Sequence, residues 1–230
     1  MKEINISEYE NIDKSKQHSL MNTIEIIDGE NNFPIPLIKQ QSFCEYQIYL
    51  QHVKHVKTSK TIKNSHGNEI QNQLEDIFKE DTSSMSFKKA IETSKNESLM
   101  SRKFFVESLN YGIRSFVDEI WLKDDEIVII NDAQGRTPYE STMNFTRACC
   151  LAFSDMIDDE RVMKAALKER GTENLFWIEV FTDEIKKDIE KVVNRIHDLL
   201  KGNEEFEHCN SLNKCSECEF KEYCEFNLKK

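Results

Sequence analysis

Apolar residues recur along this chain with two different periods, and the change of period predicts the order of helices and strands. From Leu37 to about Val56 they fall three or four positions apart, which predicts two short helices. The same spacing over 67–78, 139–156 and 183–201 predicts three more helices. Thr182 and Gly202 are typical of the start and the end of the last one.

Runs rich in β-branched and aromatic residues predict strands between these helices. Phe104–Leu109, Ile113–Leu122 and Ile127–Ile130 are separated by short turn sequences, so we expect a three-stranded antiparallel meander. A fourth strand is expected over 174–181. This order predicts an α/β fold with a mixed sheet flanked by helices. Residues 1–31 are polar and are expected to be an extension that is partly ordered at most.

The composition is that of a soluble globular protein, since 38% of the 230 residues are hydrophobic and 32% are charged. No apolar run approaches the roughly 20 residues of a membrane span, and the N-terminus lacks the apolar core of a signal peptide. We therefore expect a cytoplasmic protein with no membrane partner. The net charge of -11 argues against nucleic-acid binding through bulk charge. A local basic groove stays open, and the lysine-rich stretch 54–63 is either a solvated loop or a phosphate contact.

Three cysteines near the C-terminus form the most specific chemical pattern. Cys215, Cys218 and Cys224 are spaced C-x2-C-x5-C, which in a reducing compartment indicates metal ligation rather than disulfides. Cys44 is the best candidate for a fourth ligand, because it sits alone in an amphipathic, helix-like segment. Such a site would be a clasp between distant parts of the chain. Four thiolates suit zinc or an iron–sulfur cluster, and the residues leave that choice open.

Three stretches together resemble a known family: Phe43-Cys44 with Tyr46 and Tyr49-Leu50, the run Gly112 to Ile120, and the C-terminal cysteines. They are similar to the CRISPR-associated RecB-like exonucleases with a 4Fe-4S cluster, within the PD-(D/E)xK nuclease superfamily, over roughly residues 33–228. The resemblance implies a restriction-endonuclease-like fold. It assigns the cluster to Cys44, Cys215, Cys218 and Cys224, with Cys209 as a reserve ligand. It also implies DNA and CRISPR acquisition proteins as partners.

The resemblance divides the chain into a polar extension (1–31), a nuclease-like domain (32–208) and a C-terminal cysteine cluster (209–230). It also marks an active site. In the family, Mg²⁺ or Mn²⁺ is bound by an Asp at the end of the second meander strand and by Asp/Glu-x-Lys on the next strand, and a His assists.

Most of these catalytic residues are replaced in this chain. Asp118 is present, but Asn131, Ala133 and Gln71 stand where the second carboxylate, the lysine and the histidine belong. Asp132 is not expected to compensate, because neighbours on a strand point to opposite faces.

We therefore favour a catalytically silent member of the family, which binds DNA or a partner in spacer acquisition or DNA processing, with Mg²⁺ or Mn²⁺ binding in doubt. One alternative is an active exonuclease with a relocated metal site that uses a basic residue such as Arg136 or Arg147. The other is an acidic protein-interaction module. Cys149 and Cys150 lie on the apolar stripe of their helix and are expected in the core.

Overall fold

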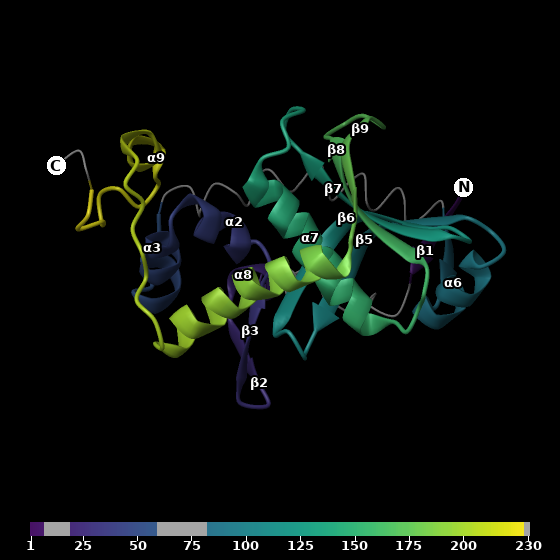
Figure 1. The fold of residues 1–230 in the computed structure, drawn as a ribbon, viewed down its shortest axis with the longest axis horizontal. Coiled ribbons are helices and arrows are strands. Elements are labelled where there is room, and N and C mark those ends of the chain that lie inside the picture. The colour runs from purple at the N-terminus through teal and green to yellow at the C-terminus, as the bar shows by residue number, and fades with distance from the viewer. Residues whose placement is uncertain (7–18, 59–81, 228–230) are drawn as a thin grey trace.

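The structure is a computed structural model that describes residues 1–6, 19–58 and 82–227. The expected helix over 67–78, and with it Gln71, lies outside these residues. A mixed sheet forms the centre of the molecule, with helices packed on it (Figure 1). In spatial order its strands are β4 (Ser83–Met85), β1 (Lys2–Ile6), β5 (Leu99–Ser108), β6 (Ile113–Leu122), β7 (Glu126–Ala133), β8 (Val162–Glu169) and β9 (Leu175–Val180).

The expected meander is confirmed, because β5, β6 and β7 are joined by antiparallel pairing. β7 and β8 are parallel and are connected by α7 (Glu140–Met156), as a parallel pair requires. The sequence analysis did not predict β8. The mixed α/β architecture itself is as expected.

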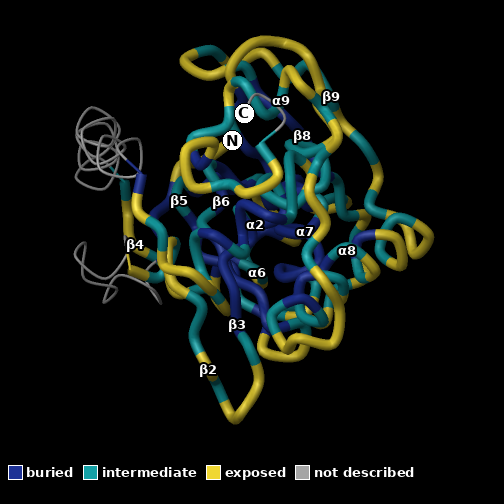
Figure 2. Tube along the Cα trace, turned by 90° about the vertical axis from the view of Figure 1, so that its left-hand side faces the viewer, coloured by how far each residue is buried: buried dark blue, intermediate teal, exposed yellow. Residues whose placement is uncertain are grey.

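Helix α7 lies across the sheet, and α8 (Asp183–Lys201) and α2 (Leu37–Phe43) lie beside it (Figure 1). Its long apolar stripe is buried between these elements (Figure 2), and Cys149 and Cys150 are fully buried in it, which confirms their place in the core. The predicted ends of α8 are also confirmed. The Thr182 hydroxyl accepts a hydrogen bond from Ile185 N–H, and Gly202 adopts a left-handed conformation.

The N-terminal residues are not a simple polar extension. β1 pairs in parallel with β4 and β5, and its Ile4 and Ile6 side chains are buried. Further on, β2 (Glu25–Ile27) and β3 (Glu30–Pro34) form an antiparallel hairpin. Phe33 of β3 then pairs in parallel with β6. The described part of this region is therefore integral to the fold.

A fully buried arginine fixes the N-terminal region to the sheet. The Arg114 guanidinium donates to the backbone carbonyls of Leu20, Thr23 and Asn32, and to the Asn32 side chain. Because Arg presents its donors in a rigid fork, one side chain can satisfy all of these acceptors. Arg114, part of the run that suggested the family, therefore has a structural role.

The segment around Cys44 is broken rather than continuously helical. Between α2 and α3 (Glu45–Ile48), Cys44 is extended, and α3 continues into the short π-helix η2 (Tyr49–Val53). At the other end of the chain, α9 (Leu212–Glu217) carries Cys215. The remaining helix, α6 (Phe87–Ser94), packs near β6 on the far side of the molecule from α9 (Figure 1). No helix among the described residues is long and apolar enough to cross a membrane.

Candidate functional site

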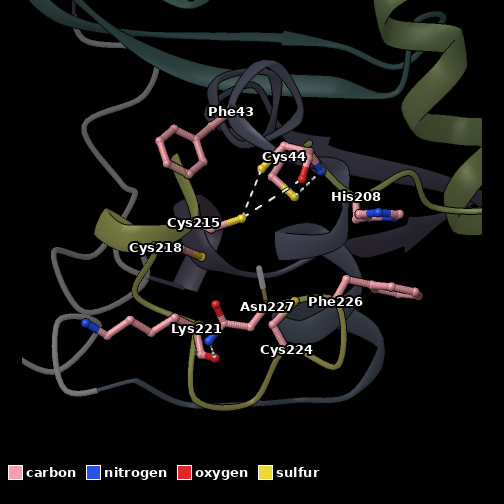
Figure 3. A pocket seen from close by; sticks show the side chains of 10 residues that line it. Phe43, Cys44, His208, Cys215, Cys218, Lys221, Cys224, Phe226 and Asn227 are labelled. Carbon is pink, nitrogen blue, oxygen red and sulfur yellow. Dashed lines mark hydrogen bonds between the residues drawn. The ribbon is translucent and has the colours of Figure 1, made fainter. Parts of the chain in front are cut away.

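Five of the seven cysteines line one pocket, at the end of the molecule where the C-terminal tail meets α2 and α3 (Figures 1 and 3). They are Cys44, Cys209, Cys215, Cys218 and Cys224, and all are free thiols. The Sγ atoms of Cys209 and Cys215 are 3.7 Å apart, and Cys209 N–H donates to Cys44 Sγ at 3.3 Å. The four predicted ligands therefore share one pocket, and Cys209 lies among them.

Contacts between distant parts of the chain hold this pocket together. Gln47 Nε2 donates to Cys218 Sγ at 3.2 Å across 171 positions of sequence. Arg195 of α8 forms a two-pronged ion pair with Glu45, and Phe220 is fully buried against Tyr46. These contacts join the residues around Cys44 to the C-terminal tail. The N-terminal strand β1 is not part of this junction, because it lies at the opposite end of the molecule (Figure 1).

Three of the cysteines, Cys44, Cys218 and Cys224, pack against a small apolar cluster that contains Tyr46 and Phe220. Burial raises the pKa of the Cys44 and Cys224 thiols, because a low-dielectric environment disfavours the thiolate. Within the described ranges, no group of three or more His, Cys, Asp or Glu side chains is arranged to hold one metal ion.

The second candidate site lies where β6 and β7 separate. Their ladder pairing ends at Glu119 and Ile130, and side chains of the next residues bridge the strands. Asp118 Oδ2 accepts from Asp132 N–H at 2.8 Å, and Asp118 N–H donates to Asn131 Oδ1 at 3.4 Å. The structure therefore places Asp118 and Asn131 side by side, as the resemblance implies.

The other Asp118 oxygen is bound by Lys103, whose Nζ donates to Oδ1 at 2.7 Å. Lys103 has a φ of 49°, a left-handed conformation that is uncommon for a residue within a strand. Both oxygens of the Asp118 carboxylate are thus engaged by protein donors. The sequence analysis did not identify Lys103 as part of this site.

Asn131 is closed off from solvent, with 1% of its surface exposed. Its Nδ2 donates to Thr146 Oγ1 at 3.2 Å and to Cys149 Sγ at 3.8 Å, both on α7. Burial raises the pKa of the Cys149 thiol to about 12, so this partner is neutral. Ala133, two residues along β7, is also buried.

Asp132 differs from its neighbours, because its Oδ1 is buried and accepts no hydrogen bond within the described structure. Burial, and then the charge of Asp118, raise the pKa of its carboxyl group. Neighbouring residues of a strand point to opposite faces. Even so, the negative charge of Asp118 acts on the Asp132 carboxyl group.

The arginines proposed for a relocated site pair with carboxylates instead. Arg136 bonds Glu169 at 2.8 Å, and Arg147 bonds Glu179 at 2.8 Å. Two other cations lie near the Asn131–Ala133 segment: Lys39 on α2, with Nζ 3.9 Å from the Phe145 ring centroid, and Arg170, whose N–H donates to Ala133 O. Sequence spacing gave no indication of either one, because only the fold brings α2 and the residue after β8 near this segment.

No known protein family matches the sequence, and a search of curated proteins finds no significant match. Solved structures do align with most of the chain. A "putative exonuclease" from Eubacterium rectale aligns with a TM-score of 0.50 and 13% identity over 94% of this chain and 92% of that one. The structure of SSO0001 aligns with a TM-score of 0.44 and 13% identity over 88% of this chain and 89% of that one. At such identities the likeness concerns the fold alone.

Proposed function

We propose that this protein is a catalytically silent relative of the PD-(D/E)xK nucleases that binds DNA and carries a cysteine-ligated iron–sulfur cluster. The observation that carries the silent assignment is the burial of Asn131, whose amide donates to α7 where a nuclease of this superfamily needs a second carboxylate. Its neighbour on the sheet, Asp118, already has both oxygens bound.

Phosphodiester hydrolysis needs a divalent metal that activates water and neutralises developing charge. Mg²⁺ and Mn²⁺ take oxygen ligands, normally one or two carboxylates together with the substrate phosphate. Here the neutral amide of Asn131 supplies no charge, and its Nδ2 would present hydrogens to a cation. Lys103 occupies the side of Asp118 that a metal would need. The arrangement therefore supports binding without hydrolysis.

The cysteine pocket fits an iron–sulfur cluster by its donor set. Cys44, Cys215, Cys218 and Cys224 would hold the cluster, with Cys209 as the alternative sulfur ligand. Each thiolate of a four-iron cluster binds a different iron, which suits cysteines spread around one pocket. When bound, such a group would contribute folding energy to the junction between α2–α3 and the tail.

DNA is proposed as the ligand because two independent likenesses point to nucleases: the sequence resemblance, and the shared fold of the Eubacterium rectale protein. A role in CRISPR spacer acquisition or DNA processing rests on the sequence resemblance alone. Co-purification with acquisition proteins from a host that encodes them would test that setting.

One observation favours a second function, a metal-dependent exonuclease with a relocated site. Asp132 Oδ1 is buried without a hydrogen bond among the described residues, and the carboxyl group lies in the field of Asp118. A cation between Asp118 and Asp132 would satisfy this oxygen. We rank this function second, because Lys103 and the Asp132 N–H already bind Asp118.

The two functions are separated by one experiment on anaerobically purified protein. End-labelled single- and double-stranded DNA is incubated with Mg²⁺ or Mn²⁺, and binding and cleavage are measured on the same samples. We expect binding without cleavage. Cleavage that Asp118→Ala and Asp132→Asn abolish, and that the exposed-turn control Asp124→Asn retains, would establish the second function. Absence of DNA binding would refute the proposed ligand.

A further inference from the structure

Cys209 is the pocket cysteine that a set of four ligands leaves over. It lines the same pocket as Cys44, Cys215, Cys218 and Cys224, and it is half-buried. An iron–sulfur cluster of this type takes four thiolates, so a fifth cysteine among the ligands is available for other chemistry. That chemistry depends on which of the four sulfur atoms Cys209 meets.

The side chains of Cys209 and Cys215 are in contact through their sulfur atoms. Their Sγ atoms are 3.7 Å apart, and the Cys215 thiol also points towards the Cys209 carbonyl oxygen at 4.0 Å (Figure 3). The sulfur atoms of a disulfide are about 2.05 Å apart, so these two atoms must approach by about 1.7 Å to form one. The pair is therefore close to the geometry of a disulfide without being bonded.

The local structure allows this approach. Cys209 lies two positions before Ser211, the N-cap residue of α9, and Cys215 is the fourth residue of that helix. The residue before an N-cap often packs against the fourth helical residue, and Cys209, one position earlier, makes a contact of the same kind. Two of the connecting residues, Asn210 and Leu212, are exposed. The connecting segment can therefore adjust without disturbing the core.

Cys44 is the competing partner for Cys209, and it is less suitable. Its Sγ accepts a hydrogen bond from the Cys209 backbone N–H at 3.3 Å, a contact that a bridge between the two would disturb. Cys44 is also fixed between α2 and α3, which both carry buried side chains. By contrast, Cys215 lies on the short helix α9, which has no buried residue. Closing a bridge to Cys215 therefore costs less distortion.

We propose that Cys209 and Cys215 form a reversible disulfide when no cluster is bound, and that this bridge withholds Cys215 from iron. The inference rests on the iron–sulfur cluster of the proposed function and adds redox control to it. One sulfur atom cannot serve in both, and oxidation would leave three of the four cluster ligands. In a reducing compartment such bridges are normally transient and redox-sensing.

The oxidant in this reaction is a small-molecule disulfide such as oxidised glutathione. One cysteine thiolate attacks it, forms a mixed disulfide and releases one glutathione thiolate. The second cysteine thiolate then attacks the protein sulfur of the mixed disulfide, which closes the Cys209–Cys215 bond and releases the second glutathione. Two protein thiols are oxidised, one glutathione disulfide is reduced to two thiols, and the two protons of the cysteines pass to the two glutathione thiolates.

The first test maps disulfides in the full chain, expressed under iron limitation and treated with oxidised glutathione before the remaining thiols are alkylated. Trypsin cleaves after Lys214 and endoproteinase Glu-C after Glu217. Cys209, Cys215 and Cys218 therefore fall in three separate peptides. We expect the Cys209–Cys215 bridge to be about 10-fold more abundant than any other pairing, because these sulfur atoms already lie together.

Two variants accompany the wild type in this test. Cys209→Ser should leave Cys215 as a mixed disulfide with glutathione. Cys224→Ser, the matched control in the same pocket, should retain the bridge. A bridge that joins Cys44 to Cys209, or equal pairing among the five cysteines, would overturn the inference.

The second test asks whether bound iron and the bridge exclude each other. Anaerobically purified protein that contains iron is treated with oxidised glutathione in the same way, and the bridge should form about 10-fold more slowly, because a thiolate bound to iron cannot attack the oxidant. Removing the iron with a chelator should restore the faster rate. Equal rates with and without iron would overturn the exclusion. If the anaerobic protein contains no iron, the cluster is refuted, and the bridge stands or falls by the first test.

Discussion

Replacing Asn131 with aspartate introduces the carboxylate that the proposed relationship to nucleases would place at this position, and we expect this change to destabilise the protein. The Asn131 amide donates to Thr146 Oγ1 at 3.2 Å, while the Thr146 hydroxyl itself donates to Thr142 O at 3.1 Å. A carboxylate oxygen at this position would therefore face another acceptor. With 1% of the residue exposed, water cannot replace the lost donor.

The size of the effect follows from these contacts. Losing the hydrogen bond costs about 1 kcal/mol, and a buried, unpaired charge raises the total to about 3–5 kcal/mol at pH 7. For a chain of this length, that lowers Tm by about 10 °C. The new carboxyl group would have a folded-state pKa raised above its unfolded value of about 3.9. The part of the cost that comes from the buried charge is therefore absent below about pH 4. It grows with pH and reaches only about 1.5 kcal/mol at pH 5.

Urea unfolding of Asn131→Asp at pH 7 and pH 5 measures both quantities. Asn96→Asp, in the exposed turn after α6, is the matched control and should change stability by less than about 0.5 kcal/mol. An Asn131→Asp protein as stable as the wild type at pH 7 would refute the argument that this position is closed to charge. Recovery of stability in millimolar Mg²⁺ would show that the scaffold still binds a divalent cation there.

Three further predictions concern stability and the cysteine pocket. Arg114→Met leaves four acceptors in the N-terminal region without their buried donor, so urea unfolding should show a loss of about 3–5 kcal/mol; a loss under 1 kcal/mol would contradict the structural role. Asp132→Asn should raise Tm at pH 7, because the pKa of Asp132 is raised in the fold, and the gain should disappear as pH falls below about 4; a lower Tm at pH 7 would argue for a bound cation. Anaerobic protein should contain about four irons per chain, and Cys44→Ser should lose them while Cys149→Ser, in the core, retains them. Loss of iron in Cys209→Ser but not in Cys44→Ser would make Cys209 the ligand.

Elements with a strong apolar period could be predicted from the sequence, and those that depend on distant pairing could not. The stripe of α7 and the capped helix α8 were predicted, as was the meander with its short turns. β1 was missed because two isoleucines in a polar segment form no recognisable pattern on their own. β8 was missed because its buried centre, Ala165-Ala166-Leu167, has no strong β preference.

The same distinction between local patterns and distant pairing applies to the residues of the two candidate sites. Cysteine spacing identified three of the residues that line the pocket, Cys215, Cys218 and Cys224, because metal ligands follow short, regular spacings. The cations at the second site could not be predicted, since Lys39, Lys103 and Arg170 come from α2, β5 and the end of β8. Only the sheet order and the packing of α2 on α7 bring them near Asp118. The left-handed backbone of Lys103 has no counterpart in its sequence context.

Binding of Mn²⁺ tests most directly the claim that the nuclease-like centre no longer holds a divalent metal. The free Mn²⁺ signal in electron paramagnetic resonance is titrated against the wild type, Asp118→Asn and the control Asp124→Asn, with and without a DNA oligonucleotide. The account predicts that the three proteins take up the same small amount of Mn²⁺ and that DNA does not change it. Stoichiometric Mn²⁺ binding by the wild type that Asp118→Asn abolishes and Asp124→Asn retains would contradict the account.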